Sequence, residues 1–258
     1  MDTRFWGPSG WRLLHLITFA YTPADKVAVR NLFKLLPFVL PCKYCRTSLA
    51  EYMDRLPLEP ALESRETLTI WLWKVHNEVN SKLRNQKLIS EPDPPFEKVQ
   101  QYYKNMLATG CSRTIFPGWE FLFSIATLHP YSMSARKSVP MPGAPPCETM
   151  ATMEEKNKWN CLKPNERLPL YNTFWLSIGS CLPFKEWRDS WAKTPMPSRL
   201  HTKDDTMKWL WKVRCTLESD LELLNKCKFS HLCKNLNAFK SDCNKKARGK
   251  TCRKRRTD

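Results

Sequence analysis

Apolar side chains recur every three or four residues along most of this chain, and few segments alternate polar and apolar residues. The first spacing is typical of an α-helix that packs one face against a core, and the second is typical of a strand. The helical spacing is clearest in five segments, at 11–21, 29–40, 46–53, 63–83 and 96–107. We therefore predict an all-α protein, in which Pro37 bends the second helix.

Proline-rich segments separate these patterns. The chain holds twenty prolines, and many of them cluster at 90–96, 139–146 and 194–198. Proline has no backbone N–H and is a strong breaker of regular structure, so we expect these segments to be connectors.

Three stretches of sequence occur twice, in the same order along the chain. The pairs are LPCKYCRTSL (40–49) with LPFKEWRDSW (182–191), WLWKVHNEVN (71–80) with WLWKVRCTLE (209–218), and more weakly SGWRLLHLI (9–17) with PGWEFLFSI (117–125). Shared helical composition could produce one match, but three in order indicate a diverged internal copy. We predict a first domain at 1–112, a degenerate helical repeat at 113–239 with an insertion between Leu128 and Leu170, and a basic, disordered tail at 240–258.

The second copy keeps packing residues and loses polar and sulfur groups. Its tryptophans and leucines persist, whereas six first-half residues are replaced. Cys42 and Cys45 become Phe184 and Trp187, His15 becomes Phe123, and His76, Asn77 and Asn80 become Arg214, Cys215 and Glu218. Because the scaffold survives while these groups disappear together, we predict that the six lost residues form one site in the first half.

Composition and charge limit the remaining possibilities. Hydrophobic residues make up 42% of the 258, enough for a sizeable core, and no run of about 18 apolar residues predicts a transmembrane helix. No secretory or mitochondrial signal is evident. The net charge is +17, and the tail alone holds nine basic and two acidic residues. Such a tail is either a solvated end or a contact for nucleic acid, an acidic partner or a membrane surface. It has no aromatic residue to stack on bases, so base-specific recognition is not expected.

The spacing of Cys42 and Cys45 allows three interpretations: half of a zinc site, a pair of inert buried thiols, or a redox-active pair. A closed zinc site needs four ligands, and no second C-x-x-C exists. An irregular metal site remains open at Cys227, His231, Cys233 and Cys243. A helix that begins beside Pro41, with Lys43 and Arg46 nearby, favours a thiolate. We therefore prefer the redox-active pair. The total of eleven cysteines is odd, so at least one is unpaired or pairs between chains.

Aromatic and polar residues accompany these cysteines. Asn80 follows His76 by one helical turn, with Trp71 near the start of the same helix, and His15 follows Trp11 by one turn. A dithiol beside an aromatic pocket suggests a flavin as electron acceptor. The chain lacks G-x-G-x-x-G, so a Rossmann site is not indicated and the cofactor would lie between helices.

The motifs WGPSGWRLLHLITFA, PCKYC and HNEVN, in this order, resemble the Erv/ALR sulfhydryl oxidases, especially those of large DNA viruses. The resemblance covers about residues 5–110. It implies four bundled helices with a short fifth, FAD as cofactor, oxidation of protein dithiols to disulfides, reduction of oxygen to hydrogen peroxide, and a dimer or an intramolecular pseudo-dimer. Cys45 would lie against the flavin as the charge-transfer thiolate, and Cys42 would exchange with the incoming dithiol. The residues implied to surround FAD are Trp11, His15, Trp71, His76, Asn77, Val79, Asn80 and Lys82, with His76 stacking on adenine and Tyr103 in place of a common tryptophan. A viral origin would imply the host cytoplasm or the virion.

The chain also departs from this family. Cys111 fits half of a second disulfide found in many members, but Phe96 stands where its partner is expected. The separate shuttle C-x-x-C of longer members is absent, and Cys227, Cys233, Cys243 and Cys252 are candidates to replace it. Two rival functions remain: a thioredoxin-like oxidoreductase without flavin, with 37–41 as a strand, and a non-enzymatic basic binding module.

Overall fold

Helices form nearly all the regular structure of this protein. The computed structural model describes residues 1–110, 115–198, 200–224 and 226–240, and this part of the chain contains no strand. The all-α prediction is therefore confirmed. The helices of the first half are α1 Thr3–Ala20, α2 Lys26–Val39, α3 Lys43–Arg55, α4 Leu58–Ala61, α5 Arg65–Asn85 and α6 Phe96–Ala108. Those of the second half are α7 Trp119–Thr127, α8 Met133–Arg136, α9 Met153–Lys158, α10 Pro164–Ile178, α11 Lys185–Ala192, α12 Lys203–Asp220 and α13 Phe229–Ala238, with 3₁₀ turns at Pro23–Asp25 and Cys147–Thr149.

The five helices predicted for the first half correspond to α1, α2, α3, α5 and α6, and their ends follow local chemistry. The Asp2 carboxylate accepts a hydrogen bond from the Arg4 amide and so caps α1. Ser64 caps α5 through the Thr67 amide. These caps satisfy backbone donors that have no partner inside the helix. Pro37 lies in the last turn of α2, close to where that helix ends.

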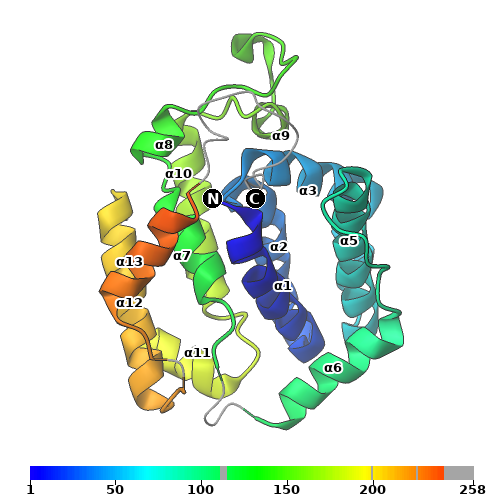
Figure 1. Ribbon diagram of the computed structural model, residues 1–258, viewed down its shortest axis with the longest axis vertical. Helices are drawn as coiled ribbons and strands as arrows, with labels where there is room; N and C mark the ends of the chain where they lie inside the picture. The colour runs from blue at the N-terminus through cyan, green and yellow to red at the C-terminus, as the bar shows by residue number, and fades with distance from the viewer. Residues whose placement is uncertain (111–114, 199, 225, 241–258) are drawn as a thin grey trace.

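The two halves of the chain meet side by side. In Figure 1, α1, α2, α3 and α5 lie on one side of the molecule, and α7, α10, α12 and α13 lie on the other. Helix α1 packs against α7, and α2 packs against α10. One hydrophobic core runs across both contacts, because residues of all four helices belong to the same buried cluster.

The contact between α1 and α7 is reciprocal at two glycines. A Cβ atom placed on Gly10 would lie 2.9 Å from the Phe121 ring, and one placed on Gly118 would lie 2.6 Å from Leu13. In the aligned segments 9–17 and 117–125, Gly10 corresponds to Gly118 and Leu13 corresponds to Phe121. Each half therefore uses its glycine to admit the apolar side chain of the other half.

Two hydrogen bonds also recur at aligned positions. The Arg46 guanidinium donates to the Leu40 carbonyl, as Arg188 does to Leu182. The Trp71 indole donates to the Leu56 carbonyl at 2.8 Å, and Trp209 donates to Thr194 at 3.2 Å. The internal repeat and its boundaries at 1–112 and 113–239 stay a prediction, which these shared contacts favour. The tail beyond residue 240 lies outside the described residues.

Residues 129–163 occupy most of the insertion predicted within the second half, between Leu128 and Leu170, and this segment lies at the top of Figure 1. It contains α8 and α9 and ends where α10 begins at Pro164, earlier than the expected Leu170. A disulfide joins Cys147 to Cys161, which the sequence analysis did not predict. Helix α9 packs on α3, where the Asn157 amide donates to the Pro37 carbonyl and the Thr47 hydroxyl donates to the Lys158 carbonyl. The insertion therefore covers the helix that follows the C-x-x-C.

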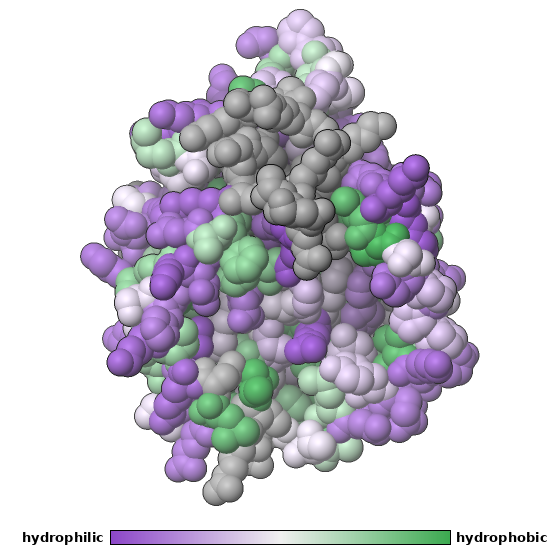
Figure 2. Space-filling model, viewed as in Figure 1, coloured by the Kyte–Doolittle hydropathy of each residue, from purple (hydrophilic) through white to green (hydrophobic). Residues whose placement is uncertain are grey.

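Hydrophilic side chains predominate on the face shown in Figure 2, where hydrophobic ones occur in small separate groups. Across the part of the chain that the structure describes, no helix has both the length and the apolar character needed to span a bilayer.

Candidate functional site

The two cysteines of the C-x-x-C lie at the entrance of α3. Cys42 has an extended backbone and occupies the N-cap position, where its sulfur accepts a hydrogen bond from the Cys45 amide at 3.3 Å. Both cysteines are in the thiol form here. Cys42 is only 1% exposed, whereas Cys45 is partly exposed. A helix N-terminus places partial positive charge beside both sulfurs, as the redox interpretation requires.

The surroundings give the two thiols different acidities. Burial acts to raise the pKa of Cys42. A hydrogen bond from the Cys45 thiol, the α-amino group of Met1, the Cys45 amide and the Arg46 guanidinium outweigh that effect and lower the pKa to about 7. The same thiol–thiol hydrogen bond, together with burial, raises the pKa of Cys45. Cys42 is therefore the more acidic sulfur of the reduced pair.

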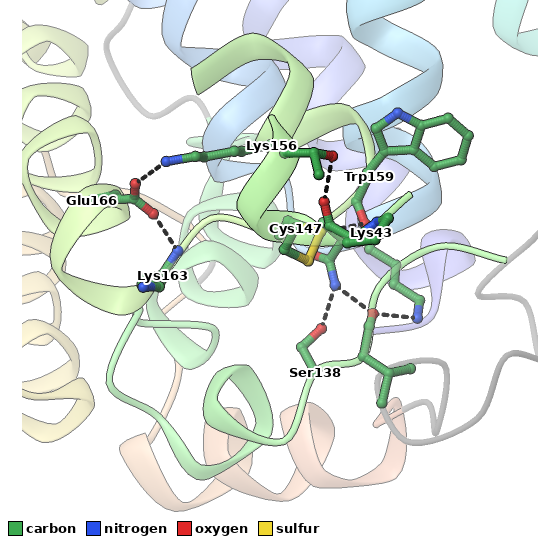
Figure 3. The surroundings of a disulfide bond; sticks show 12 residues. Lys43, Ser138, Cys147, Lys156, Trp159, Lys163 and Glu166 are labelled. Carbon is green, nitrogen blue, oxygen red and sulfur yellow. Dashed lines mark hydrogen bonds and ion pairs between the residues drawn. A yellow bond between two sulfur atoms is a disulfide. The ribbon is translucent and has the colours of Figure 1, made fainter. Parts of the chain in front are cut away.

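Two buried cations flank this pair. Lys43 is fully buried, and its ammonium donates to the Val139 carbonyl at 3.1 Å (Figure 3). Arg46 is 4% exposed, and its guanidinium donates to the Asn160 side-chain oxygen at 2.6 Å as well as to Leu40. Burial lowers the pKa of Arg46 to about 10, a value at which the guanidinium stays charged at neutral pH. Burial and the neighbouring Arg46 lower the pKa of Lys43. Both predicted basic side chains therefore lie beside the cysteine pair, and the insertion supplies one oxygen atom to each of them.

A cavity of about 540 Å³ lies between α1, α3 and α5, and Cys45 forms part of its wall. This volume is within the range of cofactor sites. The predicted site residues that line it are Trp11, Cys45, Trp71, His76, Val79, Asn80 and Lys82. Arg4 and Arg12 line it too, and among the described residues of the wall none is Asp or Glu. A cavity with aromatic walls, several cations and no carboxylate suits a flat ligand that carries negative charge.

Stacked rings form one wall of this cavity. The Trp11 indole lies on the His76 imidazole, with ring centroids 3.9 Å apart and planes inclined by 12°. His15 Nε2 lies 3.2 Å from His76 Nδ1, and Tyr103 stacks on the other side of His15 at 4.9 Å. Burial and the neighbouring His76 lower the pKa of His15 to about 3, and burial lowers that of His76 to about 4. Both imidazoles are therefore neutral at physiological pH.

Polar residues at the other end of the cavity are held by partners from outside α5. The Asn80 amide donates to Asp93 at 2.8 Å, and Arg84 forms an ion pair with the same carboxylate at 2.6 Å. The Lys82 ammonium donates to the Ser48 hydroxyl at 2.5 Å. These contacts fix the orientation of Asn80 and Lys82 toward the cavity.

The structure brings together most, but not all, of the predicted residues. His15 is 2% exposed and contacts His76 without lining the cavity. Asn77 does not line the cavity either. Sequence reasoning missed Ser48 and Tyr52, which also line it. Their positions three and seven residues after Cys45 put them on the same helix face, so helical spacing could have found them.

The remaining cysteine predictions have mixed outcomes. Within the described residues, no group of three or more His, Cys, Asp or Glu side chains could hold a metal, so the irregular site at Cys227, His231 and Cys233 is not present there. Cys227 and Cys233 are free thiols. Cys111, Cys243 and Cys252 lie outside the described residues, and their roles stay predictions.

The C-x-x-C lies at the start of a helix and beside an aromatic cavity between helices. This arrangement indicates an all-α protein that acts on thiols. The model of the Erv1 / Alr family matches residues 8–104, a range that contains every predicted site residue. A protein of Acanthamoeba polyphaga mimivirus, named "Probable FAD-linked sulfhydryl oxidase", is 33% identical over 98 residues, which cover 36% of this chain and 68% of that protein. This chain therefore belongs to the Erv1 / Alr family.

Two further relatives match the same region. A similarly named protein of Invertebrate iridescent virus 3 is 27% identical over 35% of this chain and 64% of its own length. The mitochondrial FAD-linked sulfhydryl oxidase of Saccharomyces cerevisiae is 32% identical over 33% of this chain. The match spans 47% of the yeast protein, so it covers less than two thirds of these two relatives. No solved structure gives a significant match to this chain.

Proposed function

We propose that this protein is an FAD-dependent thiol oxidase that forms disulfide bonds in protein substrates. Electrons pass from a substrate dithiol through Cys42 and Cys45 to FAD and then to oxygen, giving hydrogen peroxide. The observation that carries the proposal is that Cys45 lines an aromatic cavity whose described wall holds cations and no carboxylate. The names of the viral and yeast relatives support FAD as the ligand and thiols as the substrate.

The residues of the cavity fit FAD. Trp11, Trp71 and His76 offer flat surfaces to its rings, and neutral imidazole suits stacking on adenine. Arg12 and Lys82 offer positive charge to its diphosphate. We assign Trp11, His15, Trp71, His76, Asn77, Val79, Asn80 and Lys82 to FAD binding, with His15 acting through its contact with His76.

The two cysteines have separate roles. In the oxidised enzyme a substrate thiolate attacks the Cys42 sulfur, the Cys42–Cys45 bond breaks, and Cys45 leaves as a thiolate. A second substrate thiolate then attacks the substrate sulfur of the mixed disulfide, and Cys42 leaves as a thiolate. The substrate is released with a disulfide, and Cys42 and Cys45 are reduced by two electrons. FAD supplies a two-electron acceptor beside Cys45. Because Cys42 is 1% exposed, this exchange requires a neighbouring segment to move.

We also propose that the second half is a degenerate copy without flavin, docked where a homodimer partner would lie. Positions aligned with His76 and Asn80 hold Arg214 and Glu218, which form a buried ion pair at 2.6 Å. The Arg214 guanidinium lies 5.4 Å from the Trp119 ring, and Trp119 aligns with Trp11. Light scattering of the purified chain tests this. A monomer supports it, and a dimer formed through the first halves alone would contradict it.

The viral relatives support a proposal for the location of the protein. We propose the host cytoplasm or the virion of a large DNA virus. Immunostaining of infected cells and purified particles checks this proposal, and exclusive recovery from the secretory pathway would contradict it.

One spectroscopic experiment separates this function from its rivals. The purified full chain should show the visible absorbance of a bound flavin and should consume oxygen with dithiothreitol. A thioredoxin-like protein would be colourless, and that fold needs a sheet, whereas the described residues contain no strand. A basic binding module would consume no oxygen. A folded, colourless protein that FAD does not reconstitute would refute the proposed function.

A further inference from the structure

We propose that the protein binds a small monovalent anion, chloride in the cell, between the guanidinium groups of Arg46 and Arg167. The site shares no lining residue with the flavin cavity and lies where α3, the end of α2, the insertion and α10 meet. It is independent of the proposed oxidase function.

Two arginine side chains face one small cavity there. The cavity has a volume of about 20 Å³, and both Arg46 and Arg167 line it. The Nε atoms of both arginines are buried and have no hydrogen-bond partner. Arg46 itself is 4% exposed and uses its other nitrogens on Leu40 and Asn160. Buried polar groups are normally hydrogen-bonded, so two such N–H groups beside one cavity point to a missing acceptor.

The charges favour an anion over a water molecule. Burial and the neighbouring Arg46 lower the pKa of Arg167, and no carboxylate contributes to the acidity of either arginine. Two like charges without a counterion are costly in a protein interior. Ser138 adds a third donor: its hydroxyl oxygen accepts a hydrogen bond from Asn160 at 2.7 Å, so its own hydrogen remains available to the cavity.

The size and walls of the cavity favour a single small ion. A cavity of about 20 Å³ holds roughly one water-sized particle. The side chains that complete the wall are those of Phe38, Val39, Leu128, Ala135 and Tyr171. Such a space suits a halide, because a spherical ion accepts hydrogen bonds from any direction. Phosphate, sulfate and carboxylates are too large for it. The anion would balance Arg46, which stands four residues after Cys42 on the same helix.

Bromide locates the ion directly. Crystals of the full chain as purified, grown in sodium bromide, should show an anomalous peak between Arg46 and Arg167 in the wild type. The same peak should be absent in Arg167→Met, which removes one guanidinium and keeps an unbranched side chain. A wild-type map without a bromide peak at this position, or with only water density, would overturn the proposal, whether or not the variant folds.

Thermal unfolding supplies the measurement in solution. Replacing methanesulfonate by chloride at constant ionic strength should raise the wild-type Tm by roughly 2–5 °C, because the ion binds only the folded state. Arg167→Met should lose this response. Arg188→Met is the matched control, because Arg188 aligns with Arg46 and makes the same carbonyl contact in the second half. An equal chloride response in all three proteins would refute the site.

Discussion

The indole of Trp11 lies flat on the imidazole of His76, with ring centroids 3.9 Å apart, so helices α1 and α5 share one aromatic wall. Replacing His76 by leucine removes the imidazole but keeps an apolar side chain. We expect the affinity for FAD to fall by roughly 2- to 10-fold, the effect of losing one aromatic contact of about 0.5–1.5 kcal/mol. Fluorescence titration of the flavin-free protein with FAD measures this change.

Trp73 provides the control for that substitution. It lies on the same helix α5, donates its indole N–H to the Pro94 carbonyl and does not line the cavity. Trp73→Leu should therefore leave the affinity for FAD unchanged. A loss of affinity as large as that of His76→Leu would show that α5, and not the aromatic wall, is being disturbed.

Replacing Cys45 by serine should reduce turnover to background and leave flavin bound. Serine keeps the shape of the side chain but cannot form or break the disulfide on which the proposed chemistry depends. Oxygen uptake with dithiothreitol and the visible flavin spectrum measure the two properties separately. Cys215→Ser, which changes an exposed cysteine on α12, should retain full turnover. Retained turnover in Cys45→Ser would contradict the assigned role.

Acid should destabilise the protein through the His15–His76 pair. In the folded state the pKa values are about 3 and about 4, below the ordinary value of 6.5. Between pH 6.5 and about 4 the unfolded chain binds protons that the folded chain does not, so the free energy of unfolding falls as the pH falls. Urea unfolding at pH 7 and pH 4.5 should show this loss.

His15→Phe tests whether His15 causes that pH dependence. Phe123 occupies the position aligned with His15, so a phenylalanine already packs at the equivalent place in the second half. The difference in unfolding free energy between pH 7 and pH 4.5 should shrink in His15→Phe. His201→Gln changes an exposed histidine and should leave the difference as in the wild type. An unchanged pH dependence in His15→Phe would assign the effect to other groups.

Substitution of Gly118 by alanine should weaken the contact between the halves. The added Cβ would lie 2.6 Å from Leu13, and overpacking of this kind costs about 1–3 kcal/mol. A Cβ atom on Gly7, on α1, would meet no atom within 4 Å apart from its chain neighbours, so Gly7→Ala should destabilise the protein less than Gly118→Ala. Urea unfolding of both variants measures the difference. Equal effects would mean that the α1–α7 contact contributes little to stability.

Much of the first half could be predicted because its helices carry their own periodic signal. The five predicted helices are present, and the spacing of C-x-x-C and H-N-x-V-N placed Cys45, His76 and Asn80 at one cavity. Helix α4 was missed because four residues containing Pro60 give no measurable period. The helical pattern places Asn77 on α5, but it does not show whether this residue lines the cavity.

The parts that escaped prediction depend on contacts between distant segments. Asp93 lies in a proline-rich connector, and its carboxylate contacts both Asn80 and Arg84 of α5. The Cys147–Cys161 disulfide joins two cysteines in a segment without periodic signal. Local sequence spacing predicts neither the contact between Asp93 and Asn80 nor the pairing of Cys147 with Cys161.

Asn160 binds Arg46 across 114 positions of sequence, and this separation has a consequence for synthesis. A ribosome releases α1 to α5, and with them most of the residues that line the cavity, before it releases the residues of the insertion that contact α3. The Arg46 side of α3 therefore stays uncovered until Asn160, in the middle third of the chain, has been translated. The position of the insertion in the sequence thus sets when α3 becomes covered during synthesis.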